Sequence, residues 1–286
     1  MGDGVQFQFL QEELIMKTKL TAVLLAGITA ASMMTAFVSA DGSALDKISN
    51  AGKIVMTTNA EFEPFEYKDG DEIIGIDIEI SKKLAEKLGV ELTIDDIAFD
   101  SLIPSMNAGK ADFIAAGMTA TEERMKNVDF SEPYFNASQA IIVKVDSEIA
   151  SRDDLNGKTV GVQQGTTGDV YCTDEDGSSE VKVKEVKRYA KGMDAVSDLL
   201  AGRIDAVVID DFPAQKLVDR NSDKIMKLDE ALTEETYAIA MPKGSDLKGV
   251  VDELIAELQA SGELDEIISK YIDVEDTASA AEPAAE

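Results

Sequence analysis

The sequence contains no histidine and a single cysteine, Cys172, among its 286 residues. Without histidine there is no Ser/His/Asp triad, no Cys/His pair and no His-ligated zinc. A lone cysteine excludes an intramolecular disulfide. These absences weaken the case for an enzyme. With the rest of the sequence, they lead us to expect no catalytic residue, no metal site, no cofactor and no enzymatic activity.

Basic residues are also scarce. The chain has 27 Lys and Arg against 56 Asp and Glu, which gives a formal net charge of -29. A phosphate backbone needs clustered basic residues, so the composition argues against nucleic acid as a partner. It equally argues against a basic patch on anionic lipid. Neither a Gly-Lys-Thr loop nor a Gly-x-Gly-x-x-Gly loop is present, so the sequence indicates no nucleotide site.

The long apolar run near the N-terminus, residues 20–37, follows a basic stretch at residues 16–19 and precedes Val38-Ser39-Ala40. A basic region, an apolar region and small residues at the end are typical of a secretory signal, which predicts cleavage after Ala40. The alternative is a membrane anchor, because the run is nearly long enough to span a bilayer. Hydroxyl-bearing residues dilute it, so cleavage is favoured.

An exported protein would be periplasmic or extracellular, and no cysteine near Ala40 is available for a lipid anchor. Residues 1–15 fit neither a signal nor a fold. Gln11-Glu12-Glu13 suggests a ribosome-binding site read as protein, so we expect the true start at Met16 and treat residues 1–40 as extension and signal peptide. Residues 275–286 are rich in Ala, Glu and Pro and predict a disordered tail.

The middle of the chain contains a weak internal repeat, residues 99–114 and residues 189–208. Each copy has an aromatic residue, a short amphipathic helix, an Ala-Gly-basic-x-Asp motif and a β-rich run. Gly109 and Gly202 stand where a helix needs a left-handed C-terminal cap. A Lys-led strand precedes each copy, at residues 53–58 and 158–162.

Strands that alternate with helices predict parallel pairing and an α/β fold. Residues 76–88, with apolar positions four apart and Gly89 as cap, predict an amphipathic helix. Two repeated units predict two lobes, each a mostly parallel sheet flanked by helices. The predicted boundaries are residues 41–135 and 231–274 for lobe 1, residues 140–230 for lobe 2 and residues 136–139 for the hinge, with a second crossing at residues 237–242.

A cleft that holds a free α-amino acid needs a planar cation for the carboxylate and an anion for the ammonium group. Arg124 follows the predicted strand 112–117, at the strand end where α/β proteins bind ligands. A Glu-Glu-Arg run is otherwise typical of a solvated helix face. Asp210 ends the matching strand of the second copy, where a helix N-cap is the alternative. The repeat therefore predicts a cation from one lobe and an anion from the other.

Two aromatic residues are candidates for the apolar walls of this cleft. Phe62 lies in a polar loop and Phe99 begins the first repeat helix, although aromatic residues are more often part of a core. Thr166 and Thr167 lie where a helix would begin, and backbone N–H groups at a helix start suit a carboxylate. They are otherwise ordinary turn residues.

Five segments in this order resemble the bacterial solute-binding proteins of family 3, the polar amino-acid receptors of ABC importers. The segments are residues 59–65, 99–104, 116–124, 128–134 and 157–166. The resemblance extends over residues 53–271. It implies a two-lobed periplasmic-binding-protein type II fold with a two-segment hinge, a free amino acid as ligand, a membrane permease as partner and a monomeric state.

The resemblance also implies a role for each matching residue. Arg124 would bind the ligand carboxylate with Thr119 and the backbone of Thr166 and Thr167, and Asp210 would hold the ammonium group with the carbonyl of Gly117. Phe62 and Phe99 would flank the side chain. The remaining lining residues are Asn59 at the far end, Ala116 and Gln163.

Receptors for basic amino acids have an acidic residue where this chain has Asn59, and Ala116 replaces a hydroxyl found in some of them. A neutral polar ligand is therefore favoured over a basic one, although Glu61 or Glu66 offers an alternative charge. An enzyme alternative is a cyclohexadienyl or arogenate dehydratase on the same fold, with Glu61, Asp210 or Glu234 as general acid. A ligand-sensing domain for a receptor is a third possibility.

The start at Met16 is directly testable. Mass spectrometry of the intact precursor should find a chain that begins at Met16, and the mature protein should begin after Ala40. A peptide that contains Met1 would contradict the first expectation.

Overall fold

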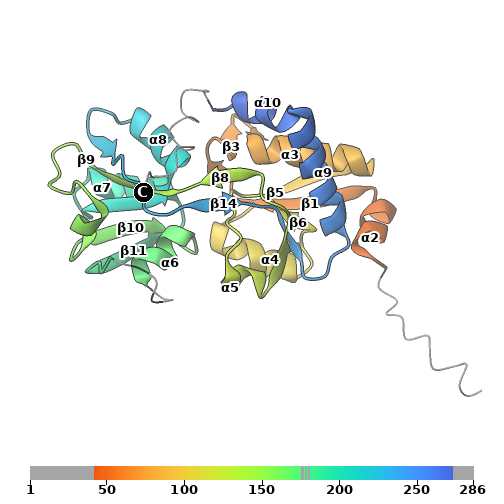
Figure 1. The fold of residues 1–286 in the computed structure, drawn as a ribbon, viewed down its shortest axis with the longest axis horizontal. Helices are drawn as coiled ribbons and strands as arrows, with labels where there is room; N and C mark the ends of the chain where they lie inside the picture. The colour runs from red at the N-terminus through yellow and green to blue at the C-terminus, as the bar shows by residue number, and fades with distance from the viewer. Residues whose placement is uncertain (1–41, 175–176, 178, 180, 273–286) are drawn as a thin grey trace, which may run out of the picture. The chain divides into compact units, whose positions relative to one another are not determined.

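The computed structural model describes residues 42–174, 177, 179 and 181–272 (Figure 1). The predicted signal peptide, the start at Met16 and the tail at residues 275–286 lie outside these residues. Among the described helices, none is sufficiently long and apolar to cross a bilayer.

The first sheet has the strand order β5-β1-β6-β15-β7. In that order its strands are Glu91–Asp96, Lys53–Thr58, Phe113–Ile114, Ala240–Pro242 and Val128–Phe130. β1 is parallel to both β5 and β6, whereas β15 is antiparallel to its neighbours β6 and β7. Four strands of this sheet therefore point one way and β15 points the other way.

The second sheet has the order β11-β10-β12-β9-β13. Its strands are Glu185–Tyr189, Thr159–Gln163, Ala206–Asp210, Gln139–Lys144 and Ile225–Lys227. β10 is parallel to β11 and β12, and β9 is antiparallel to β12 and β13. The two sheets thus share one order and one pattern of directions. The repeat predicted from the sequence is confirmed, with β1 equivalent to β10 and β6 to β12.

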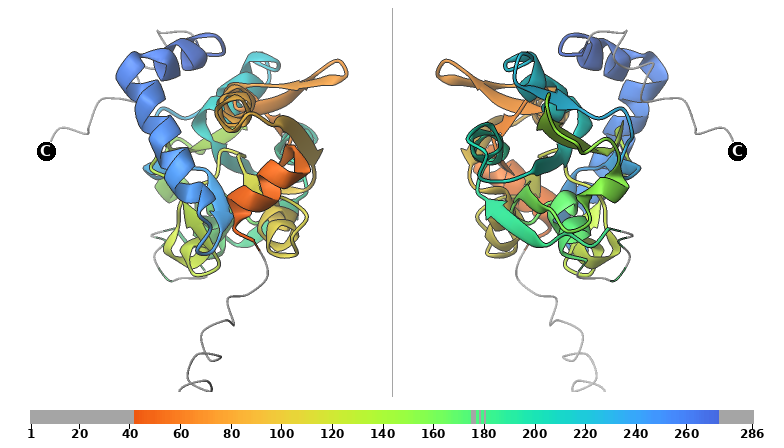
Figure 2. Two further views of the ribbon diagram at one scale, coloured as in Figure 1. Left: turned by 90° about the vertical axis from the view of Figure 1, so that its right-hand side faces the viewer. Right: turned by 90° about the vertical axis from the view of Figure 1, so that its left-hand side faces the viewer.

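Helices surround both sheets. In the first lobe they are α2 (Ala44–Ala51), α3 (Ile76–Leu88), η1 (Phe99–Ser101), α4 (Leu102–Asn107), α5 (Glu122–Met125), α9 (Leu247–Ser261) and α10 (Glu263–Ser269). In the second they are η2 (Arg152–Leu155), α6 (Thr167–Thr173), α7 (Gly192–Leu200) and α8 (Asp211–Asp219). α9 and α10, blue in Figure 2, pack against α3. The α/β class predicted from the sequence is confirmed.

The α3 helix has the predicted bounds because its buried residues recur every four positions, at Ile76, Ile80 and Leu84, along one side. Gly89 ends it with a left-handed backbone, at a φ of 67°. The first sheet buries alternate residues on its two faces. Phe113 and Ala115 belong to the same core cluster as α3 and α9, whereas Ile114 and Ala116 belong to the cluster around α4.

Two segments connect the sheets. β8 (Phe135–Ala137) leads directly into β9, and β14 (Glu235–Tyr237) leads into β15. β8 and β14 pair with each other, antiparallel, over three residue pairs. The single strand predicted at residues 237–242 is therefore wrong: it is interrupted, because the β14 part pairs with β8 and only the β15 part joins the first sheet.

A small antiparallel sheet follows β1. Its strands are β2 (Glu61–Phe62), β3 (Glu66–Asp69) and β4 (Glu72–Ile74). Gly75 follows it with a φ of 133°. A Cβ atom there would lie 2.1 Å from the carbonyl oxygen of Phe65, so only glycine allows the hairpin to pack against the start of α3. This packing places Glu66 beside the first turn of α3.

Candidate functional site

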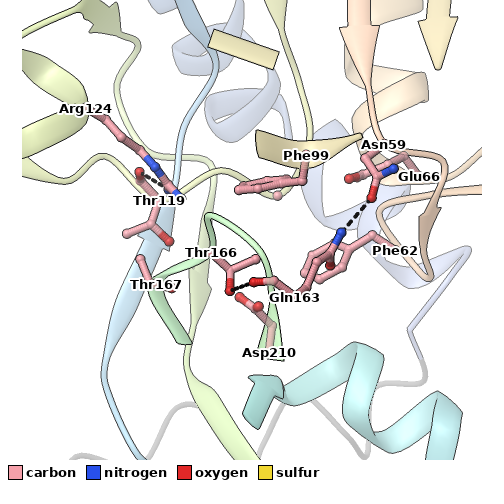
Figure 3. Close-up of a pocket in the computed structure, with 11 residues that line it drawn as sticks. Asn59, Phe62, Glu66, Phe99, Thr119, Arg124, Gln163, Thr166, Thr167 and Asp210 are labelled. Carbon is pink, nitrogen blue, oxygen red and sulfur yellow. Dashed lines mark hydrogen bonds between the residues drawn. The ribbon is translucent and has the colours of Figure 1, made fainter. Parts of the chain in front are cut away.

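A pocket lies where the parallel strands of both sheets end. It is lined by Asn59, Phe62, Glu66, Phe99, Gly117, Thr119, Arg124, Gln163, Thr166, Thr167 and Asp210 (Figure 3). Every site residue named from the sequence lines it except Ala116, and Glu66 lines it in addition. The duplicated topology explains the gathering, because carboxyl ends of parallel strands share one edge.

Ala116 does not reach the pocket. It is 1% exposed and packs with the cluster around α4, because alternate residues after β6 face opposite sides. The next residue, Gly117, has a φ of 50°, and a Cβ atom there would lie 2.5 Å from the ring of Phe62. Glycine therefore permits both the turn and the close approach of the ring. The structure limits the strand predicted at residues 112–117 to Phe113–Ile114.

Arg124 lies at one end of the pocket on the short helix α5. Its guanidinium donates to the carbonyl oxygen of Thr119 at 2.8 Å and to that of Gly165 at 3.0 Å. It also lies over the ring of Phe99, 5.3 Å from the centroid. Its contacts thus come from both lobes, and they leave the positive charge without a carboxylate in contact among the described residues.

Burial lowers the pKa of Arg124 from its ordinary value, while the negative charges of Glu235 and Asp210 oppose this effect. An arginine remains protonated in proteins at any ordinary pH. The guanidinium is therefore a permanent cation in a partly buried place, which suits a carboxylate ligand.

Asp210 ends β12 and stands at the N-cap position of α8, but its side chain does not cap the helix. Instead its carboxylate accepts a hydrogen bond from the hydroxyl of Tyr237 at 2.5 Å. Burial and then the charge of Glu235 raise the pKa of Asp210 to about 7. The helix-cap alternative therefore does not describe this side chain, which is directed at the pocket.

Glu235, on β14, is a residue that the sequence did not indicate. One of its oxygens accepts from the hydroxyl of Thr119 at 2.6 Å and from that of Thr167 at 2.8 Å. It thereby connects one residue of each lobe. A single acidic residue in a short strand carries no pattern, so only the pairing of β14 with β8 reveals its place.

Asn59 and Glu66 lie at the opposite end from Arg124 (Figure 3). The amide of Asn59 is already engaged: it donates to the carbonyl oxygen of Ile97 at 2.9 Å and accepts from Gln163 at 2.8 Å. Glu66 is 0% exposed, and neither carboxyl oxygen receives a hydrogen bond within the described part of the chain. Burial, followed by the charges of Asp77 and Asp210, raises the pKa of Glu66 well above its ordinary value.

Asp77 lies behind Glu66, in the first turn of α3. It is also 0% exposed, and its two oxygens accept from the backbone N–H of Gly117 at 2.8 Å and from the hydroxyl of Tyr134 at 2.7 Å. Burial raises the pKa of Asp77 to about 6, although these hydrogen bonds oppose it. The sequence showed only an acidic residue at a helix start, where such residues are common.

The lobes touch around the rim as well. Gln164 donates to Asp100 at 2.9 Å, and two ion pairs join Lys191 to Glu61 and Arg220 to Glu63. All three contacts connect a residue of the second lobe to one near the ends of β1 or β5. Exposed pairs contribute only about 0–1 kcal/mol each, so these contacts add little to the stability of the contact between the lobes.

Comparison with known proteins identifies the family. The bacterial extracellular solute-binding proteins of family 3 match residues 54–274. The chain belongs to this family. It is 35% identical over 246 residues to the arginine-binding extracellular protein ArtP of Bacillus subtilis, a match that covers 85% of this chain and 95% of that protein.

Solved structures of this family agree with the fold. A mutant of the protein ArgBP from T. maritima is 43% identical, with a TM-score of 0.74, and the match covers 80% of this chain and 98% of that one. The ABC transporter substrate-binding protein AbpA of Streptococcus pneumoniae, bound to L-arginine, is 35% identical with a TM-score of 0.72, covering 83% and 100%. The two-lobed type II binding-protein fold is confirmed.

Family 3 proteins bind extracellular solutes, and this removes the dehydratase alternative. Two of the acids considered for it, Glu61 and Glu234, are exposed and do not line the pocket. The described residues also contain no group of three side chains able to hold a metal ion.

The unpartnered carboxyl of Glu66 should cost the ligand-free protein stability at high pH. A raised folded-state pKa means that stability falls as pH rises from the ordinary value, 4.5, through the folded value. Glu66→Gln should therefore increase the free energy of unfolding at pH 8 by about 1–3 kcal/mol, which raises the melting temperature. The difference should shrink toward pH 5, where the wild-type carboxyl binds its proton.

Thermal melts at both pH values check this expectation, with Glu72→Gln, a change at an exposed residue of the adjacent strand, as the matched control. A Glu66→Gln variant that melts below the wild type at pH 8 would contradict it.

Proposed function

We propose that this protein is the substrate-binding component of an ABC importer and that it captures free arginine or a similarly cationic α-amino acid. The observation that carries the proposal is Glu66, a buried carboxyl without a hydrogen-bond donor among the described residues, at the end of the pocket far from Arg124.

The two ends of the pocket suit the two ends of arginine. Arg124 would bind the α-carboxylate and Asp210 the α-ammonium, as the family resemblance implies for these positions. The ligand side chain would then extend past Phe62 and Phe99 toward Glu66. A guanidinium there would gain charge-assisted hydrogen bonds from Glu66 and attraction from the aromatic faces.

Glu66 changes the preference drawn from the sequence. The neutral Asn59 favoured a neutral ligand, but the amide of Asn59 is committed to Ile97 and Gln163. Glu66 reaches the same end from β3 and supplies a negative charge. The similarity of this chain to the arginine-binding protein ArtP, to arginine-bound ArgBP and to AbpA bound to L-arginine supports the cationic assignment.

Ligand capture would proceed by closure of the lobes. Arg124 belongs to the first lobe and Asp210 to the second, so an intact amino acid stabilises the closed form more than the open one. We assign the hinge to residues 136–139, between lobe 1 at residues 41–135 and 231–274 and lobe 2 at residues 140–230. β14, in the second segment of lobe 1, pairs with residues 135–137. The closed form would dock, as a monomer, on a membrane permease.

We also propose that the protein is exported. Family 3 proteins are extracellular, and the basic and apolar stretches before Ala40 support a cleaved signal. The absence of cysteine near Ala40 supports release as a protein without a lipid anchor.

Arginine should stabilise the purified mature protein by about 2.7 kcal/mol at 100 times its dissociation constant. Glu66→Gln should weaken the binding of arginine by about 1.5–3 kcal/mol, or about 10–150-fold in dissociation constant, because a charge-assisted hydrogen bond is lost. Citrulline has a side chain of the same length but no charge, so its binding affinity should fall far less in this variant. Calorimetric titration of both ligands checks this, and equal losses for the two would contradict the role of Glu66.

Arg124→Ala should weaken the binding of every amino acid by about 100-fold or more, because two charge-assisted hydrogen bonds to the ligand carboxylate are lost. Arg203→Ala, which removes only a surface pair with Asp198, should leave binding unchanged. Thermal-shift measurements with arginine decide the matter. If Arg124→Ala keeps the full shift, the carboxylate assignment is wrong.

A further inference from the structure

Glu66 and Asp77 carry two buried carboxyl groups on neighbouring elements: the backbone N–H of Asp77 donates to the carbonyl oxygen of Phe65, the residue before Glu66, at 3.0 Å. They come from two elements, β3 and the first turn of α3, and both side chains are 0% exposed. No lysine or arginine of the described residues forms an ion pair with either. Two ionised carboxylates in contact and away from water repel strongly, so such pairs retain a proton.

The hydrogen bonds of the pair show where this proton resides. Both oxygens of Asp77 accept, from the N–H of Gly117 and the hydroxyl of Tyr134, which favours the ionised form of Asp77. Glu66 accepts from no described donor. The natural arrangement is a protonated Glu66 that donates to an ionised Asp77.

Other groups that face the pair favour the proton as well. Asp210 at the end of β12 and Asp96 at the end of β5 add negative charge toward Glu66. The two nearby tyrosines are Tyr134, before β8, and Tyr237, on β14. Burial raises the pKa of both well above 10.0, so their hydroxyls stay neutral. The cation Arg124 lies at the opposite end of the pocket (Figure 3).

We propose that Glu66 and Asp77 share one proton in the ligand-free protein and that a cationic ligand side chain displaces it into solvent. The inference rests on the proposed function, because it takes Glu66 as the partner of that side chain. The exchange balances: the pair changes from one negative charge to two, the ligand brings one positive charge, and one proton passes to the buffer. Asp77 acts as a positioning residue, since it does not line the pocket.

A neutral ligand of the same shape would leave the proton in place. The protonated carboxyl of Glu66 would donate to the carbonyl oxygen of a ureido or amide side chain, whereas the ionised carboxyl would accept from a guanidinium. The pair therefore sets ligand choice by pH. Arginine gains affinity relative to citrulline as pH rises, by up to about tenfold per pH unit where a full proton is released.

The test is calorimetric titration of the wild-type protein at pH 7 in phosphate and in Tris, buffers with different ionisation enthalpies, with arginine and with citrulline. Asp210 faces the same α-ammonium group in both cases, so its contribution cancels in the difference. Arginine should release about one proton more than citrulline. Equal release by both ligands would overturn the shared proton while the binding function stands. Absence of arginine binding would instead overturn the proposed function.

Asp77→Asn provides the second arm. Its amide still accepts a hydrogen bond from Gly117 or Tyr134 and donates to an ionised Glu66, so arginine should bind with the excess proton release lost. Asp265→Asn, on the exposed side of α10, should retain the wild-type excess. A full excess in Asp77→Asn would overturn the inference, and if that variant does not fold, the wild-type comparison decides alone.

Discussion

Burial of a guanidinium and a carboxyl group at the two ends of one pocket is the constraint to which the surrounding structure responds. The guanidinium of Arg124 donates to two carbonyl oxygens and the carboxyl of Glu66 has no described donor, so no described residue forms an ion pair with either group. Removal of a charge from water costs several kcal/mol unless a partner compensates. In the proposed function, a dipolar ligand of suitable length would supply both partners at once.

The duplicated sheet explains how one short set of strands can form such a site. Equivalent strands β6 and β12 end at the pocket: Gly117 and Thr119 follow β6, and Asp210 is the last residue of β12. Two equivalent strands therefore place different functional groups at the same pocket. Hydrogen bonds such as Gln163 to Asn59 then join the ends of β10 and β1, which are themselves equivalent.

The sequence predicted the fold and most of the pocket because the signals were local and periodic. The spacing of Ile76, Ile80 and Leu84 defined α3, and the Ala-Gly-basic-x-Asp motif identified both repeats. Arg124 and Asp210 were predicted from the rule that parallel strands share an edge, whereas Asn59 was placed by the family resemblance.

The rest depended on contacts between distant segments. Asp77 shows only as an acid at a helix start, and its bonds to Gly117 and Tyr134 cross 40 and 57 residues of chain. Ala116 was placed in the pocket by analogy, yet the alternation of side chains turns it toward α4. Whether Glu61 or Glu66 supplied the charge could not be decided before the hairpin was seen, because adjacent strands of a hairpin can present either residue to the interior.

The pairing of β8 with β14 has a mechanical consequence. Three residue pairs join these strands, so the two connections between the lobes form one ribbon rather than two independent tethers. A twist in either strand passes through the ladder to the other. Relative movement of the lobes would therefore bend both strands together.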